Sequence, residues 1–437
     1  MKYDQDTLDQ IRRGRSRFIA MVATYGLGTF NDSFFRQSAM LLAVAHEHAA
    51  MQGWIMSLFA LPYLLFASLT GWVADRFSKK HVVIAAKALE VVAMSLGAIG
   101  IITLNWWFVM GMVFIMATQS CLFSPALNGS IPELYPDVYV TKANGTLKLV
   151  VMLTILAGGA AAGVAMSLEG TGWGGVSMER IGVAVGVVAI ALSGLAFSFG
   201  VVRRPAADPN APMPRRGPIS TLRELLAIRR DSLLAKVIAT NVFIWFAGSL
   251  LIQFINLMAQ EEFGWPKQVA GYLVAAELIG LAIGGLLVSR LGGGPRWYRT
   301  LGASILGMGG LLVVMEMLPM LPDAGGVLGS WAPSARRLAA YGLLGAIGIV
   351  GGSVIIPCEA FVQRRPPAGR KGTVLASAGF AVFSGILVSG PLANFMAAPG
   401  ADGRPLVEPT RAMALLGVAA LGAGAFFRRA YAKETEA

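Results

Sequence analysis

Twelve apolar segments, each about as long as a helix must be to cross a bilayer, restrict this chain to one class of fold. A helix that spans the hydrocarbon core needs about 20 apolar residues, and backbone polar groups inside lipid must be bonded internally. The sequence therefore predicts spans near 18–45, 52–74, 82–104, 106–127, 144–167, 181–202, 233–259, 268–289, 300–320, 338–358, 373–397 and 411–428. We expect an all-α polytopic membrane protein whose twelve transmembrane helices form two pseudo-symmetric six-helix bundles.

Composition agrees with this expectation. Only 14% of the 437 residues are charged and 55% are hydrophobic, whereas soluble domains carry about 25% charged residues. A net charge of +12 would favour a nucleic-acid partner for a soluble protein. Here the loops explain the excess of basic residues, so we expect no nucleic-acid partner.

Lysine and arginine are distributed unevenly between the two sets of loops. With the N-terminus in the cytoplasm, 26 of them fall in inner segments and six in outer ones. Cytoplasmic loops carry the excess of basic residues in membrane proteins, so both termini are expected to be cytoplasmic. The predicted parts are a cytoplasmic tail (1–17), an N-terminal bundle (18–202), a linker with an amphipathic helix (203–232), a C-terminal bundle (233–428) and a second cytoplasmic tail (429–437).

The linker contains Thr221-Leu-Arg-Glu224, a capping-box pattern that predicts the start of a short helix at Thr221. The apolar residues Leu222, Leu225 and Leu226 fit a helix that lies on the membrane surface. They fit a purely structural connection equally well.

The most charge-rich break between apolar segments is Gly71-Trp-Val-Ala-Asp75-Arg76-Phe-Ser-Lys79-Lys80. A related pattern, Gly285-x-x-x-Ser289-Arg290, occupies the corresponding place in the second set of six. This repetition indicates two halves of parallel orientation, and transporters built in this way bind their substrate near the membrane midplane.

Two sets of six spans joined by a basic loop resemble the major facilitator superfamily. The motif at 71–80 resembles the signature loop of that superfamily, with Ser78 where a second glycine is usual. The resemblance implies a rocker-switch transporter with a cytoplasmic latch, and charges next to a helix N-terminus can break and remake ion pairs during rocking. The alternative is that these charges only set the topology. The latch residues would be Gly71, Asp75, Arg76, Lys79 and Lys80.

Four short elements resemble the lysophospholipid transporter branch of the superfamily. They are Asn31-Asp32-Ser-Phe34-Phe35-Arg36, Lys87-x-x-Glu90, Gln119-Ser120 with the following Ser124-Pro125 and Asn128-Gly129, and Ala143-Asn144-Gly145. The resemblance implies a flippase that moves lysolipid to the inner leaflet of a bacterial inner membrane, where a separate acyltransferase would act on it. Two departures, Leu127 for a lysine and Lys148 for a glutamate, rearrange the local charge and leave the substrate open.

Ionisable residues inside the spans cost about 2.5–3.5 kcal/mol each to insert and are therefore functional candidates. Asp32 and Arg36 are spaced for an i,i+4 pair, and Lys87 and Glu90 for an i,i+3 pair. A closed set of structural ion pairs is one interpretation, and a water-accessible site is the other. The candidate substrate-binding or coupling residues are Asn31, Asp32, Arg36, Lys87, Glu90, Gln119, Ser120, Asn144, Lys148 and Glu277.

A polar headgroup held by these charges, with an acyl tail along an apolar side, would suit such a site. Candidates for that side are Phe34, Phe35, Phe59, Phe66 and Phe123, although aromatic residues in spans commonly serve packing. We therefore expect a lipid or amphipathic small-molecule substrate, contacts with membrane lipids, and a monomer.

Nothing in the sequence predicts catalysis. The three histidines lack metal-ligand spacing, and no glycine-rich phosphate-binding loop is present. We expect no enzymatic activity, metal or cofactor. The competing hypothesis is a proton-coupled efflux pump for small amphipathic compounds, with Asp32 or Glu90 as the proton carrier.

Overall fold

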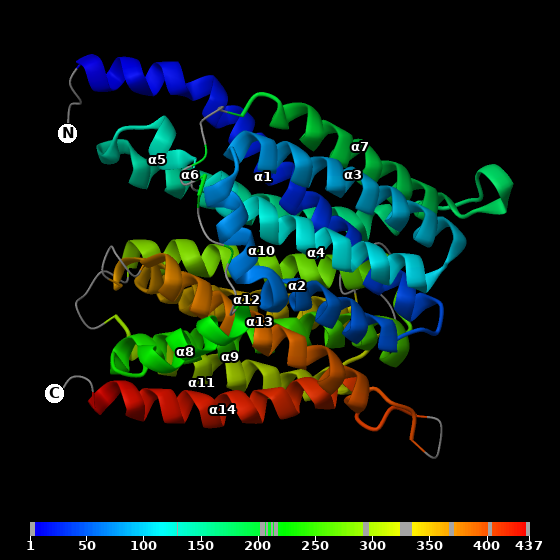
Figure 1. Cartoon of the computed structure of the whole chain (residues 1–437). Coiled ribbons are helices and arrows are strands. Elements are labelled where there is room, and N and C mark those ends of the chain that lie inside the picture. Colours follow the sequence, from blue (N-terminus) through cyan, green and yellow to red (C-terminus); the bar gives the residue numbers. More distant parts are fainter. Residues whose placement is uncertain are drawn as a thin grey trace. The chain divides into compact units, whose positions relative to one another are not determined.

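The computed structural model describes residues 5–128, 130–201, 206, 209–210, 213, 217–291, 297–323, 334–366, 371–400 and 404–433. Figure 1 shows that helices make up almost all of this part of the chain. Within the same residues, β-structure is limited to two isolated bridges, Thr171↔Ser177 and Pro399↔Pro405.

Each of the twelve predicted spans coincides with a helix. The first half contains α1 (Gln5–Ala45), α2 (Ala50–Arg76), α3 (Lys79–Thr103), α4 (Trp106–Asn128), the short α5 (Ile131–Leu134), α6 (Asp137–Ala165), the turn η1 (Trp173–Gly175) and α7 (Met178–Ser198). The linker helix is α8 (Gly217–Ile228). The second half contains α9 (Ser232–Leu257) with the π-turn η2 (Met258–Glu262), α10 (Lys267–Leu291), α11 (Arg299–Val314) with the 3-10 turn η3 (Met315–Met320), α12 (Ala335–Arg364), α13 (Lys371–Met396) and α14 (Pro409–Lys433).

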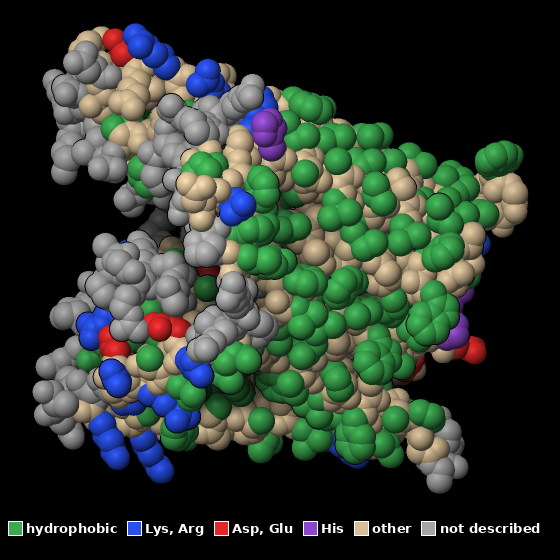
Figure 2. Space-filling view, viewed as in Figure 1, with side chains coloured by type: hydrophobic (Ala, Val, Ile, Leu, Met, Phe, Trp, Pro, Cys, Tyr) green, Lys and Arg blue, Asp and Glu red, His purple; other side chains and the backbone are tan. Residues whose placement is uncertain are grey.

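Ten helices in the described part are long and apolar enough to cross a membrane. Together with α1 and α2 they give the twelve spans of the predicted polytopic fold. The 41 residues of α1 extend about 60 Å at 1.5 Å per residue, about twice the hydrocarbon thickness, so its polar first turns extend beyond the membrane. Hydrophobic side chains cover much of the face seen in Figure 2, as expected for helices that contact lipid.

The internal contacts divide the chain into two compact units. Unit 1 comprises Met1–Ala39 and Leu58–Ser220, and unit 2 comprises Met40–Ser57 and Thr221–Ala437. The last turns of α1 and the first turns of α2 therefore belong to unit 2. There the Nδ2 of Asn256 on α9 donates a hydrogen bond to Gln52 Oε1, at 2.8 Å.

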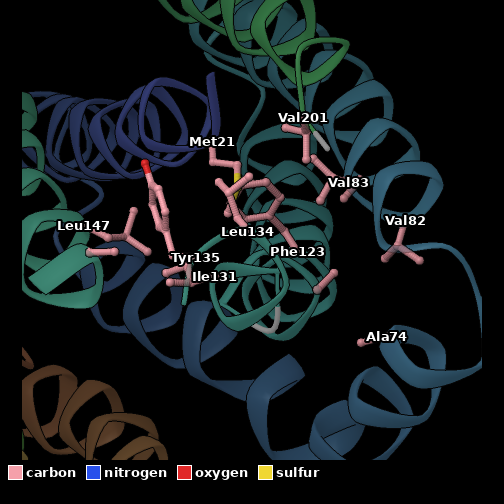
Figure 3. Packing of buried hydrophobic residues seen from close by; sticks show 13 residues of the cluster. Met21, Ala74, Val82, Val83, Phe123, Ile131, Leu134, Tyr135, Leu147 and Val201 are labelled. Atoms are coloured by element: carbon pink, nitrogen blue, oxygen red, sulfur yellow. The ribbon is translucent and has the colours of Figure 1, made fainter. Parts of the chain in front are cut away.

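A cluster of buried apolar side chains joins six helices of unit 1, α1 to α6 (Figure 3). Its members include Met21 of α1, Val83 of α3, Phe123 of α4, Leu134 of α5 and Leu147 of α6, each at most 7% exposed. The cluster fixes the same helices that carry most of the intramembrane charges of this unit.

The linker helix differs from its prediction at the N-terminal end. It begins at Gly217, four residues before the expected start, so Thr221 lies inside the helix and does not cap it. The Thr221 carbonyl oxygen accepts a hydrogen bond from Ser377 Oγ of α13, at 3.3 Å, which attaches one face of α8 to unit 2. Leu222 and Leu226 remain exposed, and contact of this face with the membrane surface stays a prediction.

In unit 2, α10 and α12 approach each other at backbone distance along a row of glycines. A Cβ atom at Gly348 would collide with the carbonyl oxygen of Glu277, and one at Gly352 with that of Leu281. Small residues allow this approach in membrane helices, where van der Waals packing replaces the hydrophobic effect.

We expect Gly348→Ala and Gly352→Ala to lower the melting temperature of the detergent-purified protein, because overpacking costs about 1–3 kcal/mol. The matched control is Gly351→Ala on the same helix, since a Cβ atom there meets nothing within 4 Å. That substitution should leave the melting temperature unchanged or raise it, because alanine has the higher helix propensity. Equal effects of all three substitutions would contradict the packing described.

Candidate functional site

A buried ion pair lies at the centre of the candidate site in unit 1. The Nζ of Lys87 lies 2.5 Å from Glu90 Oε2, one helical turn along α3. The two side chains are 1% and 0% exposed, so neither charge is stabilised by bulk water. The i,i+3 pair predicted from the sequence is confirmed.

Asn31 of α1 connects this pair to α7. Its Nδ2 donates a hydrogen bond to the carbonyl oxygen of Val187, at 3.0 Å, and a longer one to Glu90 Oε1, at 3.5 Å. Asn31 is fully buried. Three helices are thus joined through one amide side chain.

The Lys87 side chain passes between α1 and α7 at two glycines. A Cβ atom at Gly28 would lie 2.5 Å from Lys87 Nζ, and one at Gly194 would lie 3.5 Å from it. The ring of Phe123 on α4 lies 4.8 Å from the same nitrogen, within the range of cation–π attraction. Nothing in the local sequence distinguishes these two glycines from the others among the 53 of the chain, so their role cannot be predicted from the sequence.

Asp32 makes a different set of contacts on the neighbouring face of α1. Its Oδ2 accepts a hydrogen bond from Ser120 Oγ of α4 at 2.7 Å, and Ser120 Oγ in turn accepts one from Gln119 Nε2 at 2.8 Å. The Oδ1 of Asp32 and the Oε1 of Gln119 are buried and have no hydrogen-bond partner in the described part of the chain. Asp32 therefore has an acceptor oxygen without a hydrogen-bond partner among the described residues.

The predicted pair between Asp32 and Arg36 is present as an attraction between the two charges, without a hydrogen bond between them among the described residues. The Arg36 guanidinium lies over the ring of Phe59 on α2, with Cζ 4.5 Å from the centroid, while Ser120 supplies the donor to Asp32. The i,i+4 spacing brings the two charges near each other, and a cation–π contact from another helix determines where the guanidinium lies.

Three further candidate residues do not belong to this described site. Glu277 on α10 belongs to unit 2, is 6% exposed, and its Oε2 has no hydrogen-bond partner among the described residues. The side chains of Asn144 and Lys148 lie outside the described part of the structure.

Two of the expected latch residues make contacts inside unit 1. Arg76 lies over the ring of Trp72, with Cζ 5.4 Å from the centroid, and Lys80 Nζ donates a hydrogen bond to the Phe199 carbonyl oxygen at the end of α7, at 2.6 Å. Lys79 is buried in the first turn of α3. The side chain of Asp75 and the surroundings of Gly71 are outside the described part, so the latch stays a prediction.

The fold and the site can now be compared with known proteins. A profile of the Major Facilitator Superfamily matches residues 18–390. The chain belongs to this superfamily. It is a multi-pass membrane transporter, and its predicted family is confirmed.

Curated relatives give a finer comparison. The lysophospholipid transporter LplT of Escherichia coli O6:K15:H31 (strain 536 / UPEC) is 25% identical over 357 residues, covering 79% of this chain and 80% of the relative. The protein of the same name from Cronobacter sakazakii is 27% identical over 354 residues, with the same shares of both chains.

Solved structures of other superfamily transporters share the fold. A bacterial homologue of the lysosomal transporter Spinster, in an inward-facing and unoccupied conformation, has a TM-score of 0.66 at 16% identity, over 96% of this chain and 98% of that one. A D-xylose–proton symporter has a TM-score of 0.64 at 15% identity, over 94% and 96% of the two chains.

The ion pair at the centre of the site makes a testable prediction about stability. Removing one partner of a buried pair leaves an uncompensated charge and costs about 3–5 kcal/mol. We therefore expect Lys87→Met and Glu90→Gln each to lower the melting temperature strongly, and the double variant to recover most of the loss.

The control is Glu316→Gln, which breaks the exposed Arg411–Glu316 pair, whose atoms lie 3.3 Å apart. Exposed pairs contribute about 0–1 kcal/mol, so the melting temperature should hardly change. A double variant as unstable as the sum of the single ones would show that Lys87 and Glu90 do not stabilise each other.

Proposed function

We propose that this protein is a lysophospholipid transporter that moves lysolipid to the inner leaflet of a bacterial inner membrane. One observation carries the proposal: three of the four elements that resemble the lysophospholipid branch contribute buried polar side chains to unit 1. Asn31, Lys87 and Glu90 form one hydrogen-bonded set. Asp32, the residue after Asn31, forms a second set with Ser120. The relatives named lysophospholipid transporters support the same substrate class.

The charges of the site fit a zwitterionic headgroup. Lys87 and Glu90 neutralise each other, so they serve to hold Asn31 and the helices in place. The free Oδ1 of Asp32 can accept a hydrogen bond from the ammonium of a lysophosphatidylethanolamine. The guanidinium of Arg36, which lies over the ring of Phe59 and is attracted by Asp32, can turn to donate to the phosphate.

The transport cycle we propose is rocker-switch alternating access, with both termini in the cytoplasm and the 71–80 motif as the cytoplasmic latch. The excess of lysine and arginine in the loops expected to be cytoplasmic supports this orientation. The protein would act as a monomer without enzymatic activity of its own, and a separate acyltransferase would use the delivered lysolipid.

Transport of labelled lysophosphatidylethanolamine into the inner leaflet of spheroplasts tests the proposal. We expect Asp32→Ala to lower the initial rate at least tenfold, because it removes the acceptor for the headgroup ammonium. The matched control is Ser193→Ala on α7, since that exposed hydroxyl bonds only to the Ala189 carbonyl oxygen of its own helix. The absence of uptake by well-expressed wild-type protein would overturn the proposed substrate.

Proton-coupled efflux of an amphipathic compound is the second candidate, and the unpartnered Glu277 Oε2 is the observation that favours it. A carboxyl group without a cation inside the membrane is a proton-binding group by default. If lysolipid flipping is the function, an uncoupler and Glu277→Gln should both leave the uptake rate within about twofold of wild type.

The efflux hypothesis predicts the opposite effect of the uncoupler and of Glu277→Gln on transport. It predicts an export that follows the pH gradient and is lost both in the presence of the uncoupler and in Glu277→Gln. Measuring uptake and export on the same spheroplast preparation decides between the two functions.

A further inference from the structure

An apolar groove of about 330 Å³ lies in unit 1 between α1, α6 and α7. Figure 1 shows these three helices among the membrane-crossing elements of that unit. All the residues that line the groove are apolar, and none of them belongs to the charged site described above. They include Phe30 and Phe34 of α1, Ala161 of α6, Leu168 just beyond the end of α6, and Gly186 and Ile190 of α7.

Aromatic rings of α1 and glycines of α6 and α7 shape this groove. The rings of Phe30 and Phe34 stack with centroids 6.0 Å apart, and a Cβ atom at Gly186 would lie 3.2 Å from the Phe34 ring. Three residues before Ala161, α6 packs closely against α1 at Gly158, where a Cβ atom would collide with the Phe30 carbonyl oxygen. The groove is therefore bounded by Gly186 of α7 on one side and by the close contact of α1 with α6 at Gly158.

The groove is separated from the charged site by α1 itself. Phe30 and Phe34 are each two residues from Asp32, which places them about 200° around a helix of 3.6 residues per turn. Asp32 contacts Ser120 of α4, whereas the Phe34 ring lies against Gly186 of α7. A lipid whose headgroup is bound at Asp32 cannot reach the groove with its tail without passing around α1.

We propose that this groove binds one acyl chain of a resident bilayer phospholipid, which is not the transported molecule. The lining residues lie on helices that cross the membrane, so hydrocarbon is the medium outside the groove. A water molecule would need two to four polar partners, and the lining offers no polar side chain. An apolar cavity of about 150 Å³ already holds benzene, so the larger groove accommodates several methylene groups of a chain.

A bound acyl chain would also stabilise the charged site by packing against helices that form it. It would lie against Phe34 and Gly186, next to Val187, whose carbonyl oxygen accepts the hydrogen bond from Asn31. The chain replaces the van der Waals contacts that an empty groove would forfeit, so it holds α7 against α1. The site is thus a structural lipid site, distinct from the transport route.

Photo-crosslinking tests this inference without any transport measurement, so its outcome is independent of the proposed function. The purified protein is reconstituted in phosphatidylethanolamine vesicles that contain a trace of phosphatidylethanolamine with a diazirine in mid-chain. After illumination, labelled residues are mapped by mass spectrometry. We expect labelling of α6 and α7 at the groove to exceed, by at least fivefold, labelling at Leu153, an equally lipid-exposed residue of α6 outside the groove.

Filling the groove supplies the matched variants. Ala161→Phe should lower the groove labelling at least fivefold, while Leu153→Phe on the same helix should leave it unchanged. Melting temperatures check that both variants fold. If Ala161→Phe does not fold, Ala161→Leu is used in its place.

Three results would overturn the inference. Uniform labelling of all lipid-exposed residues would show that the groove holds no particular chain. Labelling that survives the filling of the groove at Ala161 would place the chain elsewhere. Displacement of the label by excess lysophosphatidylethanolamine would assign the groove to the transported class of lipid instead.

Discussion

The pairing of Lys87 with Glu90 inside an apolar bundle is the constraint that determines the local design of unit 1. A buried charge is tolerated only if it is paired and its remaining hydrogen-bonding capacity is satisfied. Each surrounding helix therefore contributes something specific. Glycines of α1 and α7 leave room for the lysine, Phe123 of α4 provides a ring face, and Asn31 provides the second hydrogen bond to the glutamate.

Asp32, the residue that follows Asn31 on α1, shows the opposite arrangement. One carboxylate oxygen is bonded to Ser120, and the other is buried without a partner in the described structure. A transporter must bind and release, so a group that the protein satisfies completely is a poor ligand for cargo. This contrast supports the proposal that the closed pair on α3 has a structural role and that the half-satisfied carboxylate binds the headgroup.

The sequence predicted the features that depend on neighbours along the chain. Hydropathy located all twelve spans, and the i,i+3 spacing located the Lys87–Glu90 pair. It could not show a contact whose partner comes from another helix: Phe59 of α2 lies against Arg36, and no local pattern reports that contact. The capping pattern at Thr221 failed because a helix can begin earlier when residues before the cap continue the same turn. The division of α1 and α2 between units depends on tertiary contacts, which hydropathy does not record.

That division has a mechanical consequence. α1 is one continuous helix, and it carries Asp32 in unit 1 and Met40 in unit 2. Eight residues, about 12 Å of helix, separate Asp32 from Met40, the first residue of the chain that belongs to the other unit. A helix of this length transmits force as a rigid rod. A headgroup bound at Asp32, as proposed, would therefore act through the same helix on the Met40–Ser57 segment.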